Sequence, residues 1–94
     1  MFVFPDDARW DEAAEAVAFS VELGEYRGTC FVPRRMFHDL LGRRPTPEEC
    51  VERFHLGRTE FERLAEHKIA ARELDDDANI RLSMRDLRRF RKDG

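Results

Sequence analysis

The segment Ala16–Val32, AVAFSVELGEYRGTCFV, carries the clearest strand pattern in the chain and decides its fold class. Large apolar residues at every second position from Val17 to Leu23 alternate with smaller or polar ones, which is typical of a half-buried strand. The loop Gly24–Gly28 follows, and residues 29–32 are extended and apolar again. Two extended runs joined by a glycine-containing loop predict an antiparallel β-hairpin.

Two helices are predicted after the hairpin. A short one follows Pro33, which suits a first helical turn, and stops at Gly42. The main helix starts at Thr46, because Thr-x-x-Glu with a proline after the threonine forms a capping box. Nothing interrupts its apolar pattern until about Glu73, although Gly57 inside it costs about 1 kcal/mol relative to alanine.

The two ends of the chain complete the predicted fold. MFVFP, residues 1–5, reads as a short edge strand or an anchored arm, and residues 6–16 as an acidic turn. Near the other end, residues 80–83 predict a third short strand, and a basic helix or tail occupies about 84–94. We therefore expect a single α+β domain over 1–94, ordered β-β-α-α-β-α. Its two layers are an antiparallel sheet and a face of helices, one short and one long.

Charge is spread unevenly over the 94 residues. Charged residues make up 39% and hydrophobic residues 41%, with eight phenylalanines, which is too apolar for a disordered chain. The net charge of −3 argues against general attraction to nucleic acid or anionic membranes. Residues 31–45, however, hold four arginines and one aspartate, and residues 83–94 hold five bases and two acids. Each of these blocks can pair internally or form a patch.

The sequence gives few signs of a location outside the cytoplasm. The first residues lack the basic region and the long apolar run of a secretion signal. No apolar stretch approaches the roughly 20 residues of a membrane span. Two cysteines, Cys30 and Cys50, are too few for a disulfide scaffold. We expect a cytoplasmic protein with free thiols and no membrane partner.

The segment Cys50–Lys68 mixes sulfur, imidazole and carboxylate, and a helical wheel separates these groups. At about 100° per residue, Cys50 falls on the apolar stripe of the helix. His55 and His67 point to different sides, roughly 18 Å apart along the axis, so they cannot share a metal ion. Burial and acidic neighbours favour a neutral Cys50 thiol. We expect no cofactor and no catalytic residue here.

Arg58 is the unusual member of this helix, because it lies inside the apolar stripe, where an arginine rarely stays unpaired. One interpretation is structural: Arg58 pairs with Glu62, four residues on, at the edge of the core. The alternative is a ligand or partner contact formed by Arg58, Glu62 and His55. A metal or acid–base site near His55 would need further groups from elsewhere in the fold.

The basic tail is a candidate nucleic-acid contact. Its cations are Arg85, Arg88, Arg89, Arg91 and Lys92. The alternative is a solvated helix face that balances the acidic blocks. No recognised nucleic-acid-binding motif is present. The pairs Arg34–Arg35 and Arg43–Arg44 would extend a basic surface if the fold brings them near the tail.

No phosphate loop, nucleophile elbow or dinucleotide fingerprint occurs in the chain. The leading hypothesis is therefore a non-enzymatic protein–protein interaction or regulatory module, whose partner is another protein or a second copy of the chain. Leu56 beside Glu60, Arg63 and His67 motivates this hypothesis, since it mixes exposed apolar and charged groups. Weak nucleic-acid binding is the first alternative, and a small-ligand or metal site near His55 is the second.

Three motifs resemble a known family. They are W-D-x5-V-x-F at residues 10–19, F-x3-R-x2-F-x3-A at 54–65, and N-I-R-L-S-M-R-D-L at 79–87, and they are joined by C-F-V at 30–32. The pattern resembles the domain of unknown function 1488 of small bacterial proteins. The resemblance implies a small α+β domain with the hairpin first and the last strand late, and it implies no activity. The matching positions are Trp10, Asp11, Val17, Phe19, Cys30, Phe54, Arg58, Phe61, Ala65, Ile80, Leu82, Asp86 and Leu87.

Overall fold

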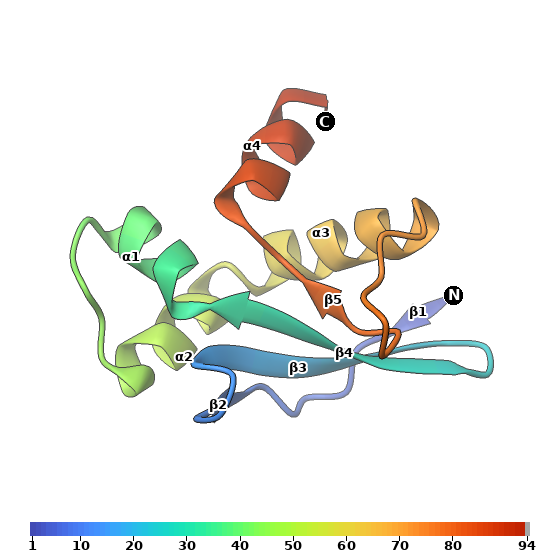
Figure 1. Cartoon of the computed structure of the whole chain (residues 1–94), viewed down its shortest axis with the longest axis horizontal. Helices are drawn as coiled ribbons and strands as arrows, with labels where there is room; N and C mark the ends of the chain where they lie inside the picture. The colour runs from blue at the N-terminus through green and yellow to red at the C-terminus, as the bar shows by residue number, and fades with distance from the viewer. Residues whose placement is uncertain (94) are drawn as a thin grey trace.

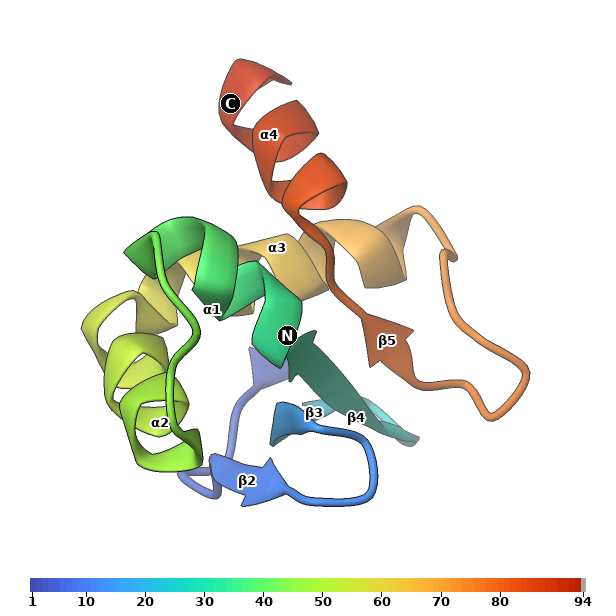
Figure 2. The ribbon, with the colours of Figure 1, turned by 60° about the vertical axis from the view of Figure 1, so that its left-hand side comes forward.

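A five-stranded sheet carries the helices on one face in the computed structural model, which describes residues 1–93 (Figures 1 and 2). In chain order the elements are β1 (Phe2–Val3), β2 (Arg9–Asp11), β3 (Ala16–Leu23), β4 (Tyr26–Pro33), α1 (Arg34–Leu41), α2 (Pro47–Leu56), α3 (Arg58–Ala70), β5 (Ile80–Arg81) and α4 (Met84–Asp93). The predicted α+β class is confirmed. None of the helices within 1–93 combines the length and the apolar character needed to cross a bilayer.

The predicted hairpin is the centre of the sheet. β3 and β4 pair antiparallel over their whole length, from Ala16 opposite Pro33 to Leu23 opposite Tyr26. Gly24 supplies the left-handed backbone of the turn, with φ at 60°. Alternate β3 residues from Val17 to Val21 point into the core and are buried. The alternation of apolar residues in the sequence therefore predicts correctly which side chains of β3 face the core.

The first edge of the sheet has one strand more than predicted. β1 pairs with the end of β3, as expected of an N-terminal edge strand, and β2 pairs with its beginning. The prediction of an acidic turn at residues 9–11 is wrong. The reason is Trp10, which lies opposite Val17 and packs against the core, so burial of its ring outweighs the polar composition around it. Asp7 fixes the intervening loop, because its carboxylate accepts hydrogen bonds from the backbone and hydroxyl of Ser20.

The other edge makes the sheet mixed rather than antiparallel, which corrects a second expectation. β5 pairs with β4 in parallel, with Ile80 opposite Cys30 and Arg81 opposite Phe31. Between the two strands the chain crosses the sheet face through α1, α2 and α3 and returns in the same direction. A parallel pair needs such a crossover, and here three helices form it.

The main helix is broken at Gly57, so the prediction of one helix to about residue 73 is wrong. Gly57 lies between α2 and α3 with φ −114° and ψ 21°, outside the helical region. Phe54 before the break and Phe61 after it stack with ring centroids 5.4 Å apart. Phe54 also contacts Phe19 of the sheet at 4.8 Å. Both phenylalanines are buried, and the packing of Phe54 on the sheet and of Phe61 on Phe54 accompanies the break.

The start of α2 has the predicted capping box. The Thr46 hydroxyl accepts a hydrogen bond from the Glu49 backbone at 3.2 Å, and the Glu49 carboxylate accepts one from the Thr46 backbone at 2.9 Å. Arg43 adds a hydrogen bond to the same carboxylate at 3.0 Å. The Arg43 guanidinium, together with the Thr46 backbone, lowers the pKa of Glu49 to about 2. This cluster ties the loop after α1 to the first turn of α2.

The first prediction concerns Gly28, where a Cβ atom would lie 2.0 Å from the Tyr26 hydroxyl and 3.0 Å from the Ala78 carbonyl oxygen. Tyr26 passes over Gly28 to donate a hydrogen bond to that carbonyl at 2.7 Å. We expect Gly28→Ala to lower the free energy of unfolding in urea by about 2 kcal/mol, because the ring must move. Tyr26→Phe keeps the ring and should cost about 1 kcal/mol. Equal losses in the two variants would contradict this packing.

The second prediction concerns Glu49. Its pKa lies below the ordinary value of 4.5, so its contribution to stability is present above pH 4.5 and is lost as the pH falls towards about 2. The urea midpoints of the wild type and Glu49→Gln should therefore differ by a constant amount above about pH 5 and converge in acid. Glu48→Gln is the control, since Glu48 makes no side-chain hydrogen bond within residues 1–93. A wild-type advantage that persists undiminished at about pH 2.5 would refute this account.

Candidate binding site at the basic end

Two strands of the sheet end side by side and each leads directly into a helix. β4 ends at Pro33 and continues into α1, and β5 ends at Arg81 and continues into α4 (Figures 1 and 2). Because β4 and β5 are parallel, their carboxyl ends lie at the same edge, which is where open sheets commonly bind ligands. The two basic sequence blocks, 31–45 and 83–94, therefore meet. We call the region formed by α1, residues 42–46, the ends of β4 and β5, and α4 the basic end.

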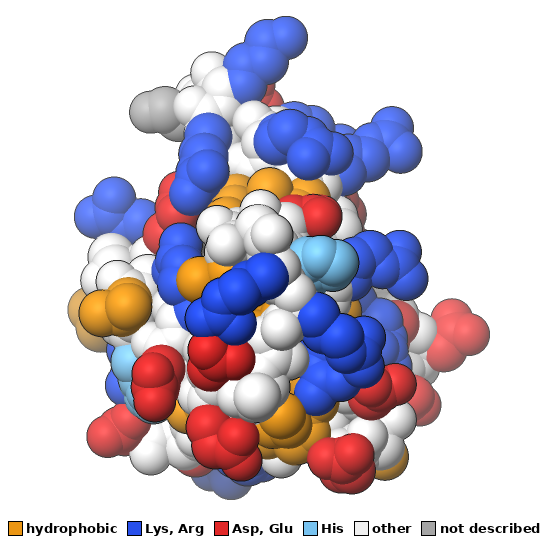
Figure 3. Space-filling model, turned by 90° about the vertical axis from the view of Figure 1, so that its left-hand side faces the viewer, with side chains coloured by type: hydrophobic (Ala, Val, Ile, Leu, Met, Phe, Trp, Pro, Cys, Tyr) orange, Lys and Arg blue, Asp and Glu red, His pale blue; other side chains and the backbone are white. Residues whose placement is uncertain are grey.

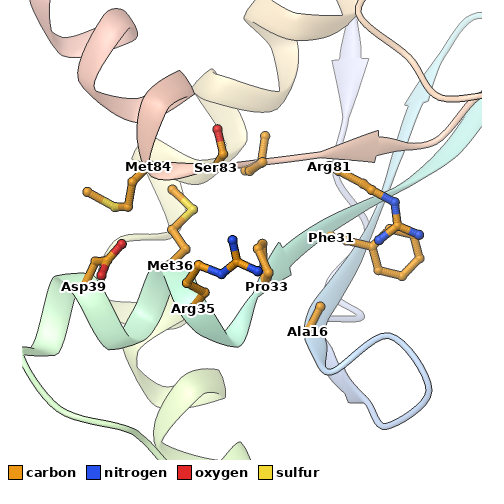
Figure 4. A pocket seen from close by; sticks show the side chains of 10 residues that line it. Ala16, Phe31, Pro33, Arg35, Met36, Asp39, Arg81, Ser83 and Met84 are labelled. Carbon is orange, nitrogen blue, oxygen red and sulfur yellow. The ribbon is translucent and has the colours of Figure 1, made fainter.

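A cavity of about 440 Å³ opens between α1 and the β5–α4 junction (Figure 4), and we call it the apolar cavity. Met36 and Leu82 in its wall are almost fully buried. Its lining residues are Ala16, Phe31, Pro33, Arg35, Met36, Asp39, Arg81, Leu82, Ser83 and Met84. Most of these side chains are apolar, and the three charged residues, Arg35, Asp39 and Arg81, are exposed. The cavity thus combines an apolar floor with a charged rim.

The two arginines of the rim are held differently. The Arg81 guanidinium carbon lies 5.0 Å from the centre of the Phe31 ring, and its Nε lies 3.6 Å from the Asp75 carboxylate. Arg35 forms no ion pair with any residue of the described chain. Asp39, one helical turn after Arg35, lines the opposite end of the cavity from Arg81 (Figure 4). The Arg81 end is therefore the cationic end.

A second cavity of about 410 Å³, the basic cavity, adjoins the first and shares Pro33 and Arg35 with it. Its lining residues are Ala14, Glu15, Pro33, Arg34, Arg35, His38 and Arg44. Arg34 lies 5.0 Å from the Trp10 ring and 3.6 Å from the Glu15 carboxylate. Its Nε is buried and has no hydrogen-bond partner in residues 1–93. Three arginines, one histidine and one carboxylate give this cavity a positive potential.

The structure divides the five predicted cations of the tail. Arg91 donates two hydrogen bonds of 2.8 Å to Glu60, and Arg89 lies 3.3 Å from Glu73, so both face α3 and the segment after it. Arg85, Arg88 and Lys92 form no ion pair with the rest of the described chain. Figure 3 shows Lys and Arg side chains gathered over α1 and α4, with acidic side chains mainly below them.

Lys68 of α3 fixes the position of α4 and β5. Its ammonium group donates to the Arg81 carbonyl at 2.9 Å and to the Asp86 carboxylate at 2.8 Å. The side chains of Lys68 and Asp86 are each only 13% exposed, so the pair is shielded from solvent. Leu87 of α4 is also buried, and the Phe90 ring packs edge-on against His67 with centroids 5.8 Å apart. The wall of the apolar cavity that α4 provides therefore depends on Lys68.

Arg58 is bound on two sides. Its Nε donates to Glu62 at 2.8 Å, which confirms the predicted local pair, and one terminal nitrogen donates to Asp6 at 2.8 Å. Hydrogen bonding to Arg58 lowers the pKa of Asp6. The charge of His55 lowers the pKa of Asp6 more weakly. Arg58 thus joins α3 to the N-terminal segment, and a ligand contact by Arg58, Glu62 and His55 stays a prediction.

The two cysteines are buried, and the side chains of residues 1–93 that could bind a metal ion are spread apart. Cys30 and Cys50 are unpaired and fully buried, and burial raises the pKa of both thiols. At Cys50 burial outweighs the opposing effect of Arg34. Within residues 1–93, no three His, Cys, Asp or Glu side chains come close enough to hold a metal ion. The hypothesis of a metal site near His55 gains no support from this geometry.

The sequence interpretation missed the apolar cavity. Phe31, Met36, Arg81 and Met84 were expected only as ordinary strand or helix residues, and Arg35 only as part of a basic pair. A signal was present, since β4 ends at Pro33 where α1 begins, and only Leu82 and Ser83 separate β5 from α4. That signal identifies a site only when β4 and β5 are known to be parallel neighbours. Their pairing depends on the path of the three helices between them, which the sequence does not show.

Comparison with known proteins agrees with the sequence motifs. A family model described as "Protein of unknown function (DUF1488)" matches residues 3–82, so α4 lies beyond the match. A solved structure from the same family, a protein of unknown function from Shewanella loihica PV-4, superposes with a TM-score of 0.79. The two chains are 20% identical, and the alignment covers 86% of this chain and 90% of the other. This likeness shows the fold. No curated protein matches the chain.

The third prediction tests the role of Lys68. Lys68→Met should lower the free energy of unfolding by about 2 kcal/mol, because it leaves the shielded Asp86 carboxylate and the Arg81 carbonyl without their donor. Amide hydrogen exchange should accelerate in α4. Arg89→Gln is the control, because Arg89 is the exposed cation near the same carboxylate: it lies 3.8 Å from Asp86 and 3.3 Å from Glu73, and it should contribute about 0.5 kcal/mol or less. If the two variants are equally stable, Lys68 does not hold α4.

Proposed function

Because the chain belongs to the DUF1488 family of proteins of unknown function, we propose a function from its own residues. The protein is a non-enzymatic interaction module that binds an acidic segment of a partner protein through the basic end. The observation that carries this proposal is the group of five cations there, Arg35, Arg44, Arg85, Arg88 and Lys92, that form no ion pair within residues 1–93.

Unpaired cations are informative in a chain with excess acid. The protein has 20 acidic and 17 basic residues, so carboxylates are available for pairing. Arg91 pairs with Glu60 and Arg58 with Glu62. Other arginines that form no ion pair within residues 1–93, such as Arg63 and Arg72, line neither of the two cavities. The basic end instead keeps cations exposed around two adjoining cavities. Such a local field raises the association rate of an anionic partner despite the overall net charge.

The surroundings of the serine and cysteine side chains support a binding role rather than catalysis. The two serines have structural partners: Ser20 hydrogen-bonds to Asp7, and the Ser83 hydroxyl accepts a hydrogen bond from the Asp86 backbone at the start of α4. Both thiols are buried with raised pKa values. These groups have structural surroundings rather than an activating base. The two unpaired thiols also suit a reducing cytoplasm, where we expect the module to act.

A protein partner fits this surface better than a nucleic acid. The apolar cavity adjoins the cations and would accept apolar side chains, which a phosphate backbone lacks. Glu15 and Asp39 line the same cavities and would repel a continuous row of phosphates. A protein segment can place its acidic residues beside the arginines and avoid the two carboxylates.

Nucleic-acid binding is the second candidate, and one observation favours it. Arg85, Arg88 and Lys92 are spaced three and four residues apart, so they share one face of α4, opposite the buried Leu87. A row of cations on one helix face can follow a phosphate backbone. Self-association is a separate proposal and stays a prediction. It rests on Leu56, which is 84% exposed, and on Val3 in the edge strand, which is 52% exposed.

The fourth prediction separates the two partners. A labelled peptide of glutamates and leucines should bind the protein, and Arg35→Gln with Arg44→Gln should weaken binding about fivefold. The matched control, Arg63→Gln with Arg72→Gln, removes two arginines that lie outside the basic end and form no ion pair among the described residues. It should leave the dissociation constant of the peptide unchanged. Fluorescence anisotropy of the labelled peptide gives its dissociation constant for each protein at about 50 mM and at about 200 mM salt.

Three outcomes of this experiment would count against the proposal. The first is absence of peptide binding even at the lower salt concentration. The second is an equal loss in the control variant, which would show that only net charge matters. The third is tighter binding of single-stranded or duplex DNA than of the peptide, with loss on Arg85→Gln and Arg88→Gln, which would favour the second candidate.

A further inference from the structure

We infer that the apolar cavity binds one large apolar side chain of a partner protein, and that this side chain is followed or preceded by a carboxylate that contacts Arg35 and Arg81. The inference rests on the proposed function and makes it specific. It assigns the binding segment a pattern, an apolar anchor beside an acidic residue, where the proposed function requires only negative charge. The geometry of the cavity and of its rim carries this assignment.

The size and lining of the cavity fit an apolar anchor. Its volume of about 440 Å³ lies within the range of about 300–1,000 Å³ typical of ligand sites. Met36 and Leu82 line it as buried residues, and Met84 and Phe31 are half-buried beside it. Methionine is flexible and polarizable, so a wall that contains two methionines can adapt to aliphatic and aromatic anchors. Burial of such an anchor supplies affinity that charge alone does not give.

The rim determines where a carboxylate can lie. Figure 4 shows Arg35 in the middle of the cavity, with Asp39 towards one end and Arg81 at the other. Arg35 has no ion-pair partner within residues 1–93, and Arg81 is held against the face of Phe31 with its nearest carboxylate, Asp75, 3.6 Å away. Asp39 would repel an acidic residue placed at its end. The carboxylate is therefore directed to the side of Arg35 and Arg81.

The neighbouring basic cavity favours a protein segment over a small molecule. The two cavities share Pro33 and Arg35, so a chain that fills one can continue into the other. The second cavity presents Arg34, His38 and Arg44 and would accept a further acidic residue. An extended segment spans neighbouring sites of different character, with the apolar side chain in one and acidic side chains along the other. We therefore commit to an acidic–apolar segment of a partner protein as the occupant.

The three methionines provide a direct test. Met36 and Met84 line the apolar cavity, whereas Met1 is fully exposed at the start of the chain and serves as an internal control. Protein labelled with ¹³C at the methionine methyl groups is titrated with a capped peptide in which one leucine stands between glutamates. We expect the methyl signals of Met36 and Met84 to shift with saturation, while that of Met1 stays in place.

Matched peptides and variants separate the anchor from the charge. Replacing the leucine by alanine should weaken binding about tenfold, because most of the buried apolar area is lost. Replacing the glutamates by glutamine should weaken it at least as much. Arg81→Gln should lower the affinity for the peptide several-fold. Arg27→Gln removes an arginine of the hairpin that has no ion pair in the described part of the chain, and it should have no effect.

The outcomes distinguish this inference from the proposed function. If the acidic peptide binds with salt dependence, but the leucine and alanine forms bind equally and neither Met36 nor Met84 shifts, the cavity is not the docking site and the proposed function stands. If no acidic peptide binds at all, both fail. Shifts of Met36 and Met84 with an apolar peptide that lacks glutamates, at equal affinity, would overturn the role given to Arg35 and Arg81.

Discussion

The position of Lys68 is the constraint on which the candidate site depends. This single ammonium group joins α3 to the last residue of β5 and to the first turn of α4, through the Arg81 carbonyl and the Asp86 carboxylate. β5 is only two residues long, and its parallel ladder with β4 is correspondingly short. A strand of that length needs support from outside the sheet. Lys68 and the burial of Ile80, Leu82 and Leu87 supply it, so the carboxyl ends of β4 and β5 stay side by side.

The parts of the fold that could be predicted are those encoded by neighbouring residues. The alternation from Val17 to Val21 sets the strand and its buried face, and the Thr46–Glu49 capping box sets the start of α2. The parts that could not be predicted depend on distant contacts. The acidic segment around Trp10 forms a strand because Trp10 packs on the core. The stacking of Phe54 on Phe61 accompanies a break in the helix, and the apolar pattern of the sequence does not reveal that break.

The same division applies to the site. Arg58 was recognisable from the sequence as an arginine on an apolar face, and its pair with Glu62 is local, but Asp6 is 52 residues away and could not be foreseen. The apolar cavity needs Met36 from one helix and Met84 from another, brought together by the parallel return of β5. The spacing of residues in the sequence can identify a single residue in an unusual environment, such as Arg58. It does not readily identify a cavity that forms between separate helices and strands.

The first turn of α1 shows that stability alone does not explain the basic end. Arg34 and Arg35 occupy the positive end of the helix dipole, the cap residue Pro33 has no side chain to accept a hydrogen bond, and no acid is present in that turn. By contrast, α2 and α4 begin with a hydroxyl cap and acidic residues. Asp39 stands four residues after Arg35, the less favourable order for a helical ion pair. Arg34 is paired with Glu15, but Arg35 forms no ion pair within residues 1–93. An arrangement that costs local stability and leaves Arg35 without a partner agrees with the binding role proposed for the basic end.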